Sequence, residues 1–234
     1  MSAPLVSCIV PVFNGERYLQ AALDSIFAQT YRSLEVLVVD DGSTDNTAAI
    51  VGSYGDRVRY LQQDNHGPSA ARNRGIEAAT CEFIAFLDAD DLWHAEKLER
   101  QMARFRARPE LDYCVTYCQN FWIPELKSEA EKYRNHRISQ PMPGFVTGTL
   151  VARRRIFETV GFFNSELAHG DSTQWFLRAA EQQAVMELLT VALTYRRLHS
   201  ENRSRLLASA SREEFLQILK SSLDRRRRSD KLAY

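Results

Sequence analysis

Apolar residues in the first half of the chain alternate between short β-rich runs and stretches with helical spacing. The β-rich runs are typical of buried strands and cover residues 5–12, 34–39, 58–62 and 83–87. The stretches between them predict helices over about residues 18–27, 45–54, 69–79 and 95–107. This β-α repeat predicts an α/β fold with a parallel, doubly wound sheet.

The second half of the chain is less regular. Its pattern predicts strands over residues 113–122, 145–152 and 185–195, and helices over 156–160, 171–183 and 213–223. Residues 124–143 are polar, mixed in charge and bounded by prolines, which predicts a mobile loop that closes over a site as a lid.

Clustered carboxylates directly follow the apolar run 83–87, in the sequence Asp88-Ala89-Asp90-Asp91. Such a cluster at the end of a buried strand is costly unless a cation offsets the repulsion, and Mg²⁺ and Mn²⁺ take oxygen ligands. We therefore interpret Asp88 and Asp90 as a metal-holding Asp-x-Asp element. The alternative is a solvated turn in which Asp91 caps the next helix.

Polar residues also follow the first two predicted strands, at Asn14, Asp40 and Asp41. Right-handed crossovers place the carboxyl ends of parallel strands on one edge of the sheet, where ligands bind in open α/β sheets. We expect these side chains to lie beside Asp88–Asp91.

Composition narrows the class of protein. The 234 residues form one large domain or two small ones, and 30 basic residues balance 30 acidic ones, which gives no indication of nucleic-acid binding. No apolar run reaches the roughly 18 residues of a membrane span, and no signal peptide is recognisable. The four cysteines lack zinc or redox spacing, so a soluble, cytoplasmic protein with reduced thiols is predicted. The sequence gives no indication of oligomeric state.

Five short motifs, in this order and spacing, resemble the family 2 glycosyltransferases, which are inverting enzymes with the GT-A fold. The motifs occupy residues 10–14, 24–31, 35–45, 67–75 and 88–90, and the resemblance covers about residues 5–204. It implies a Rossmann-like, mostly parallel sheet with helices on both faces and a smaller mixed sheet on the acceptor side. Residues 1–204 would form one GT-A domain, with a nucleotide-sugar half (1–107) and an acceptor half (108–204). Residues 205–234 would form a helical basic tail.

The resemblance implies donor-binding roles in the first half. Pro11 and Phe13 would wall the nucleotide base, and Asp41 would accept a hydrogen bond from the uracil ring. Arg72 matches an arginine that contacts the nucleotide; the alternative is a solvated helix arginine. Asp88 would contact the ribose and the metal sphere.

The metal implied by the resemblance is Mn²⁺ or Mg²⁺. Asp90 would ligate it, and the metal would stabilise the diphosphate leaving group. Asp91 is either a supporting residue of this site or a helix cap. His199 lies in a stretch, 195–204, that resembles a late Tyr-Arg-x-His…Ser element of the family. It would approach the metal or diphosphate; the alternative is a structural histidine.

The catalytic base implied by the resemblance is Asp171, in the stretch 170–178. Direct displacement at the anomeric carbon needs a base on the face opposite the leaving group. This chain has Gly170 where the family usually has Glu, which leaves the identity of the acceptor open. If Asp171 is only an N-cap, the chain binds donor without efficient transfer.

Together these features predict transfer of a sugar from a nucleotide diphosphate sugar to a hydroxyl of a glycan or lipid-linked acceptor. UDP is the preferred nucleotide, and GDP and dTDP remain open. The run Arg225–Arg228 is either a solvated helix end or a peripheral contact with the anionic inner face of a membrane.

Two other classes of protein are alternatives to a glycosyltransferase. A nucleotidyltransferase usually has a glycine-rich loop after the first strand, and residues 11–17 contain one glycine. A non-catalytic nucleotide-sugar-binding or partner module of the same fold is the second alternative, and product formation discriminates it from the enzyme.

Overall fold

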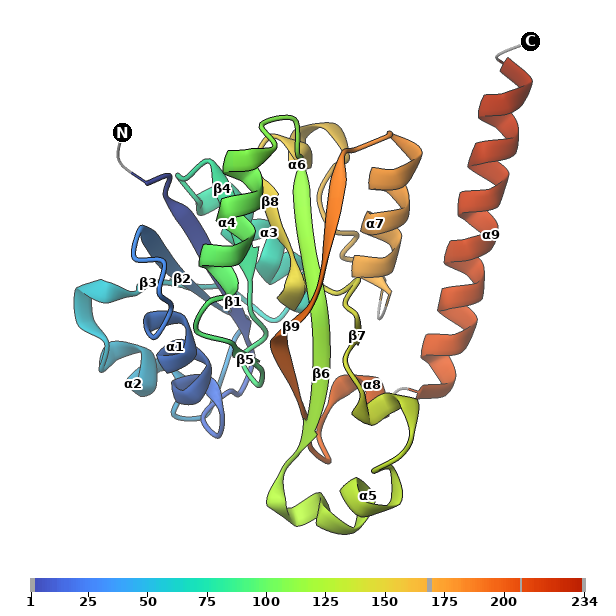
Figure 1. Ribbon diagram of the computed structural model, residues 1–234. Coiled ribbons are helices and arrows are strands. Elements are labelled where there is room, and N and C mark those ends of the chain that lie inside the picture. Colours follow the sequence, from blue (N-terminus) through green and yellow to red (C-terminus); the bar gives the residue numbers. More distant parts are fainter. Residues whose placement is uncertain (1–2, 168–169, 207, 233–234) are drawn as a thin grey trace.

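The computed structural model describes residues 3–167, 170–206 and 208–232, except for the side chains at 204, 208–212 and 226–232. Within these residues one nine-stranded sheet has the order β3-β2-β1-β4-β8-β6-β9-β5, and β7 pairs with β6. The strands are β1 (Val6–Val12), β2 (Leu34–Asp40), β3 (Arg59–Gln62), β4 (Phe83–Phe86), β5 (Leu92–Trp93), β6 (Tyr113–Trp122), β7 (Met142–Pro143), β8 (Val151–Arg153) and β9 (Met186–Leu198). The helices are α1 (Leu19–Phe27), α2 (Thr47–Gly52), α3 (Pro68–Ala78), α4 (Lys97–Ala107), α5 (Lys127–Lys132), α6 (Ile156–Thr159), α7 (Asp171–Glu181), α8 (Arg203–Leu206) and α9 (Ala208–Leu232) (Figure 1).

The first half of the chain forms the parallel part of the sheet. β1 pairs in parallel with β2 and β4, and β2 pairs in parallel with β3. Every residue of β1 and β4 is buried because α1, α2 and α4 cover one face and α3, α6 and α7 cover the other. Burial on both faces explains why these strands appear in the sequence as continuous apolar runs.

The predicted smaller sheet on the acceptor side is not separate. β8 pairs antiparallel with both β4 and β6, and β9 pairs in parallel with β6, so these strands extend the parallel part of the same sheet. The predicted strand over 145–152 is wrong in its first part, where residues Thr147–Thr149 form a 3₁₀ turn. The Thr149 hydroxyl donates to backbone carbonyls at Gly144 and Val146, which favours the turn over an extended chain.

The prediction that residues 124–143 form a loop without regular structure is also wrong. The segment contains α5 and β7 and two 3₁₀ turns, and it lies at the end of β6 (Figure 1). Glu129 of α5 accepts from Trp122 Nε1 at 3.0 Å and from Arg205 Nη1 of α8 at 3.0 Å. Its polar composition reflects a short exposed helix fixed by hydrogen bonds and ion pairs with the rest of the chain.

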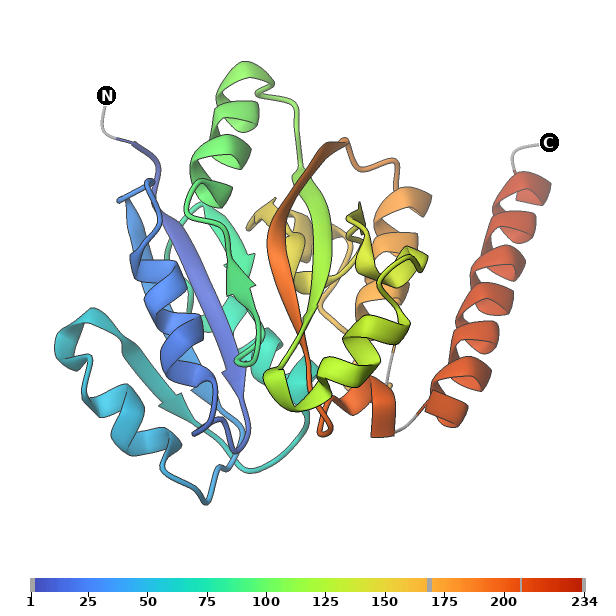
Figure 2. The same ribbon diagram turned by 60° about the horizontal axis from the view of Figure 1, so that its bottom comes forward.

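The predicted helix over 213–223 extends in both directions to form α9, which runs beside α7 in both views (Figures 1 and 2). The backbone of the Arg225–Arg228 run is helical, and the side chains of Arg226 to Arg228 lie outside the described set. Among the described residues, no helix is both long enough and apolar enough to cross a membrane.

Candidate active site

The polar residues that end the parallel strands meet at one edge of the sheet, as expected. Asn14, just after β1, adopts a left-handed conformation (φ 50°). Its Oδ1 accepts from the Thr44 backbone N–H at 2.9 Å, and its own N–H donates to Ser43 Oγ at 2.8 Å. These bonds join the loop after β1 to the loop after β2.

A narrow cavity of about 60 Å³ opens beside these loops. Its walls include the predicted base-binding residues and the start of α3, namely Pro11, Val12, Phe13, Asp41, Pro68 and Ala71. The Asp41 carboxylate is buried and accepts from Gln63 Nε2 at 2.7 Å and from the backbone N–H groups of His66 and Gly67 at 2.9 and 2.8 Å. Sequence reasoning did not identify Gln63.

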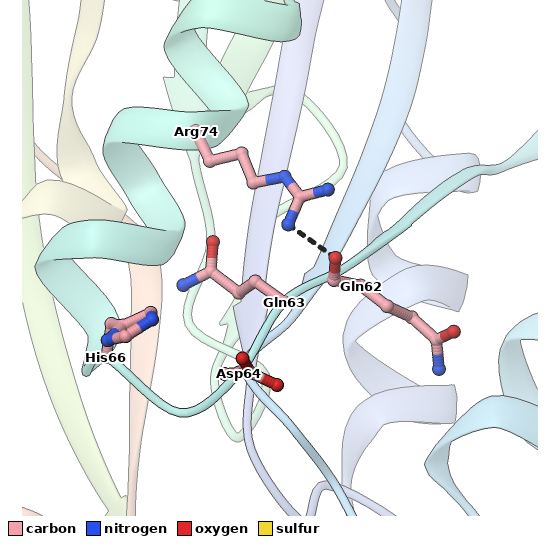
Figure 3. A pocket seen from close by; sticks show the side chains of 5 residues that line it. All are labelled: Gln62, Gln63, Asp64, His66 and Arg74. Carbon is pink, nitrogen blue, oxygen red and sulfur yellow. Dashed lines mark hydrogen bonds between the residues drawn. The ribbon is translucent and has the colours of Figure 1, made fainter.

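A wider and shallower depression of about 610 Å³ lies on the other side of the 62–66 segment, lined by Gln62, Gln63, Asp64, His66 and Arg74. Figure 3 shows Arg74 donating to the Gln62 carbonyl across it. The depression is open to solvent and contains none of the predicted site residues, so we place the candidate site at the narrow cavity.

Arg72 of α3 joins the two halves of the site. Its Nη2 lies 2.7 Å from Asp88 Oδ1, and its Nη1 lies 2.9 Å from Asp171 Oδ2. The guanidinium is only 8% exposed, so the solvated alternative is wrong. Burial by itself would lower the pKa of Arg72, but the two carboxylates outweigh it and raise the pKa. Among the described residues, its Nε has no hydrogen-bond partner.

Asp171 is the first residue of α7, and its Oδ2 also accepts from Ser69 Oγ at 2.9 Å. The N-cap of α7 is Gly170, which has φ 71° and makes no side-chain cap. The N-cap alternative for Asp171 is therefore wrong. The site residue missed here is Ser69, whose only sequence signal is its position inside the 67–75 motif.

Asp90 faces the end of β9. Its Oδ2 lies 2.9 Å from His199 Nε2 and 3.2 Å from Asn202 Nδ2, and the Asp90 carbonyl accepts from Arg197 Nε at 2.8 Å. His199 is buried, and its ring lies 4.9 Å from the Tyr18 ring, centroid to centroid. Within the part of the chain that the structure describes, its Nδ1 has no hydrogen-bond partner. Thus residues 90 and 199, far apart in sequence, are brought together.

Asp91 is buried and accepts from the Arg197 backbone N–H at 2.9 Å. Burial raises the pKa of Asp91 well above its ordinary value, and the charges of Asp90 and Asp88 add to this effect. The N-cap residue of α4 is Glu96, so the helix-cap alternative for Asp91 is wrong. Asp91 instead fixes the end of β9 that leads to His199.

An α/β domain with this sheet order and this carboxylate-lined strand edge is of the GT-A type. The chain belongs to glycosyl transferase family 2, because the model of that family matches residues 7–161. An uncharacterized glycosyltransferase of Rickettsia typhi is 33% identical in an alignment of 187 positions that covers 74% of this chain and 58% of that protein. The chain therefore spans little more than half the length of this relative.

Solved structures share the fold. S. aureus TarS 1–349 in complex with UDP-GlcNAc gives a TM-score of 0.74 at 22% identity, covering 93% of this chain and 65% of that chain. The same protein in complex with UDP gives 0.71 at 23% identity, covering 93% and 64%. The predicted family and GT-A fold are confirmed.

Proposed function

We propose that this chain transfers a sugar from a nucleotide diphosphate sugar, preferably a UDP-sugar, to a hydroxyl of a glycan or lipid-linked acceptor, with inversion. The observation that carries the proposal is the chain of contacts from Asp88 through Arg72 to Asp171 beside the narrow cavity. Through these contacts, the Arg72 side chain bridges Asp171 of the proposed acceptor half and Asp88 of the proposed donor half.

Base recognition is assigned to Asp41. A carboxylate has about four acceptor sites, and hydrogen bonds from Gln63, His66 and Gly67 use three of those on Asp41. The remaining site suits a ring N–H, which uracil, thymine and guanine present and cytosine and adenine do not. The narrow cavity favours a single ring, and the UDP and UDP-GlcNAc complexes of TarS support UDP.

Mn²⁺ or Mg²⁺ fits the residues at Asp90. The described residues contain no group of three or more His, Cys, Asp or Glu side chains that would hold a metal. Asp90 Oδ2 and His199 Nε2 lie 2.9 Å apart and would serve as two metal ligands. Protein sites for Mg²⁺ often use one or two carboxylates, and substrate phosphates and water supply the remaining ligands. When bound, the metal would stabilise the charge that develops on the diphosphate.

Asp171 is assigned as the base. It takes the proton of the acceptor hydroxyl while that oxygen bonds to the anomeric carbon. The bond from the anomeric carbon to the phosphate oxygen breaks, and the nucleoside diphosphate leaves with the electron pair. Ser69 and Arg72 hold the Asp171 carboxylate in one orientation for this transfer.

The test is calorimetric titration of UDP with and without Mn²⁺, followed by assay of UDP-sugar turnover. We expect Asp90→Ala to weaken Mn²⁺-dependent UDP binding by about 10- to 100-fold, and the exposed-site control Asp56→Ala to bind as wild type. Binding of GDP or dTDP in place of UDP would overturn the donor assignment. Nucleotide binding without turnover of any sugar would favour the non-catalytic module.

We also propose peripheral contact with an anionic membrane on the cytoplasmic side. Leu216 and Leu223 of α9 are more than half exposed, and the sequence carries six basic and two acidic residues between Lys220 and Leu232. An amphipathic helix of this kind binds anionic lipid surfaces. Sedimentation with phosphatidylglycerol vesicles, compared with phosphatidylcholine vesicles, tests it; absence of the chain from both pellets would contradict it.

A further inference from the structure

Helix α9 packs against Gly170, the residue that immediately precedes α7. Ile218 is 4% exposed, whereas Leu216 on the same helix is 58% exposed, so Ile218 lies on the side of α9 that faces the domain. Gly170 has φ 71°, and a Cβ atom placed there would lie 2.6 Å from Ile218 Cδ1. The left-handed backbone favours glycine at this position, and an added Cβ atom would force the end of the Ile218 side chain to shift.

A second contact fixes the other end of α7. Glu181 accepts from Ser222 Oγ at 2.5 Å and forms an ion pair with Arg225 Nε at 2.8 Å. Ser222 and Glu181 are largely buried. α9 therefore holds α7 at both Gly170 and Glu181.

The first turn of α7 receives no side-chain cap from its N-cap residue, Gly170. Its position depends on tertiary contacts: Asp171 meets Ser69 and Arg72 of α3 on one side, and Gly170 meets Ile218 of α9 on the other. A shift of this turn would move the Asp171 carboxylate relative to the donor half.

We propose that Ile218 is a positioning residue for Asp171. Through this contact, α9 supports the active site of the proposed transferase. The proposal rests on the proposed role of Asp171 as the base. Ile218 holds the Gly170–Asp171 backbone against α3, so loosening it lowers turnover. Because Ile218 does not touch the base-binding cavity, nucleotide affinity is unaffected.

The first experiment compares Ile218→Ala with the control Gln217→Ala, an exposed neighbour on the same helix. In Ile218→Ala we expect the Gln174 amide, which donates to the Gly170 carbonyl, to exchange hydrogen about tenfold faster. We expect kcat for the UDP-sugar to fall about 10- to 100-fold, with KM and UDP affinity within about twofold of wild type. Unchanged exchange at Gln174 in a folded variant would overturn the proposal.

A double-mutant cycle tests the same contact with smaller changes. Gly170→Ala adds the Cβ atom, and Ile218→Val removes the Cδ1 atom that the Cβ atom would meet. We expect Gly170→Ala to lower kcat and the added Ile218→Val to restore part of it, so the two effects do not multiply. Independent effects on kcat would show that this contact does not position Asp171.

The two proposals fail in distinguishable ways. If no nucleotide sugar is turned over by the wild type, the proposed function fails, while exchange at Gln174 still reports whether α9 fixes the first turn of α7. If turnover is present but insensitive to Ile218→Ala, the positioning proposal alone fails.

Discussion

Lys97 is a cationic side chain in an apolar interior. It is fully buried, donates to Gln101 Oε1 at 2.9 Å and lies 4.3 Å from the centre of the Trp93 ring. The nearby Cys8 and Cys114 thiols stay neutral, because burial raises their pKa values to about 12 and about 11. Burial lowers the pKa of Lys97 from 10.5 to about 7.

This shift makes the free energy of unfolding depend on pH. Between pH 7 and 10.5 the unfolded chain binds more protons at Lys97 than the folded chain, so stability rises with pH in this window. One pKa unit corresponds to about 1.4 kcal/mol, so the cost to the folded state is about 5 kcal/mol at pH 7 and below, and falls to zero near pH 10.5.

Lys97→Met removes this cost but leaves Gln101 Oε1 without its donor, which costs about 1–3 kcal/mol. We expect the variant to be more stable than wild type by about 2–4 kcal/mol at pH 7. The advantage should shrink by about 1.4 kcal/mol per pH unit as the pH rises.

Urea unfolding followed by circular dichroism, at several pH values from 7 to 9.5, measures this difference. The exposed Lys127→Met serves as the control and should leave the pH dependence as in wild type. If the Lys97→Met and wild-type stabilities run parallel across this range, Lys97 does not titrate near neutral pH and the burial argument is wrong.

Three further substitutions test the site and the packing of α5. Asp171→Asn should abolish sugar transfer while leaving UDP affinity nearly unchanged; a fully active variant, assayed by product formation, would remove Asp171 as the base. Arg72→Met leaves the Asp88 and Asp171 carboxylates without their shared cation, so thermal unfolding should show a loss of about 3–5 kcal/mol; a loss below 1 kcal/mol would argue against this bridge. Glu129→Gln weakens a partly exposed pair with Arg205 and should change stability by less than about 1 kcal/mol in urea unfolding; a larger loss would mean that α5 supports the fold more widely.

Some of the strands and helices could be predicted directly from the sequence. β1, β2 and β4 are continuous apolar runs because both faces of the sheet are covered, and β6 matches its predicted bounds. The carboxylates at the end of β4 and after β2 were also found, since a parallel sheet places the ends of its strands on one edge. The helix predicted over 171–183 is present as α7, and Trp175, Phe176 and Ala179 form its buried face.

Other features had no local signal. Residues 145–149 contain β-branched and aromatic side chains that favour a strand, but the Thr149 hydroxyl and the pairing of β8 with both β4 and β6 decide otherwise. The segment 124–143 is polar because its helix is exposed, and Arg205, which pairs with Glu129, lies far along the chain. Short polar segments take their structure from such distant partners.

The sequence by itself determined the parallel first half of the fold, its carboxylate edge and the family, because strand periodicity, turn residues and short motifs are local properties. Only the tertiary structure decided which residues meet: Arg72 between Asp88 and Asp171, His199 against Asp90, and Ile218 against Gly170. Each of these contacts joins elements far apart in the chain, and their geometry depends on how the helices pack across the sheet. That packing is set by the fit of whole surfaces, which no single stretch of sequence encodes.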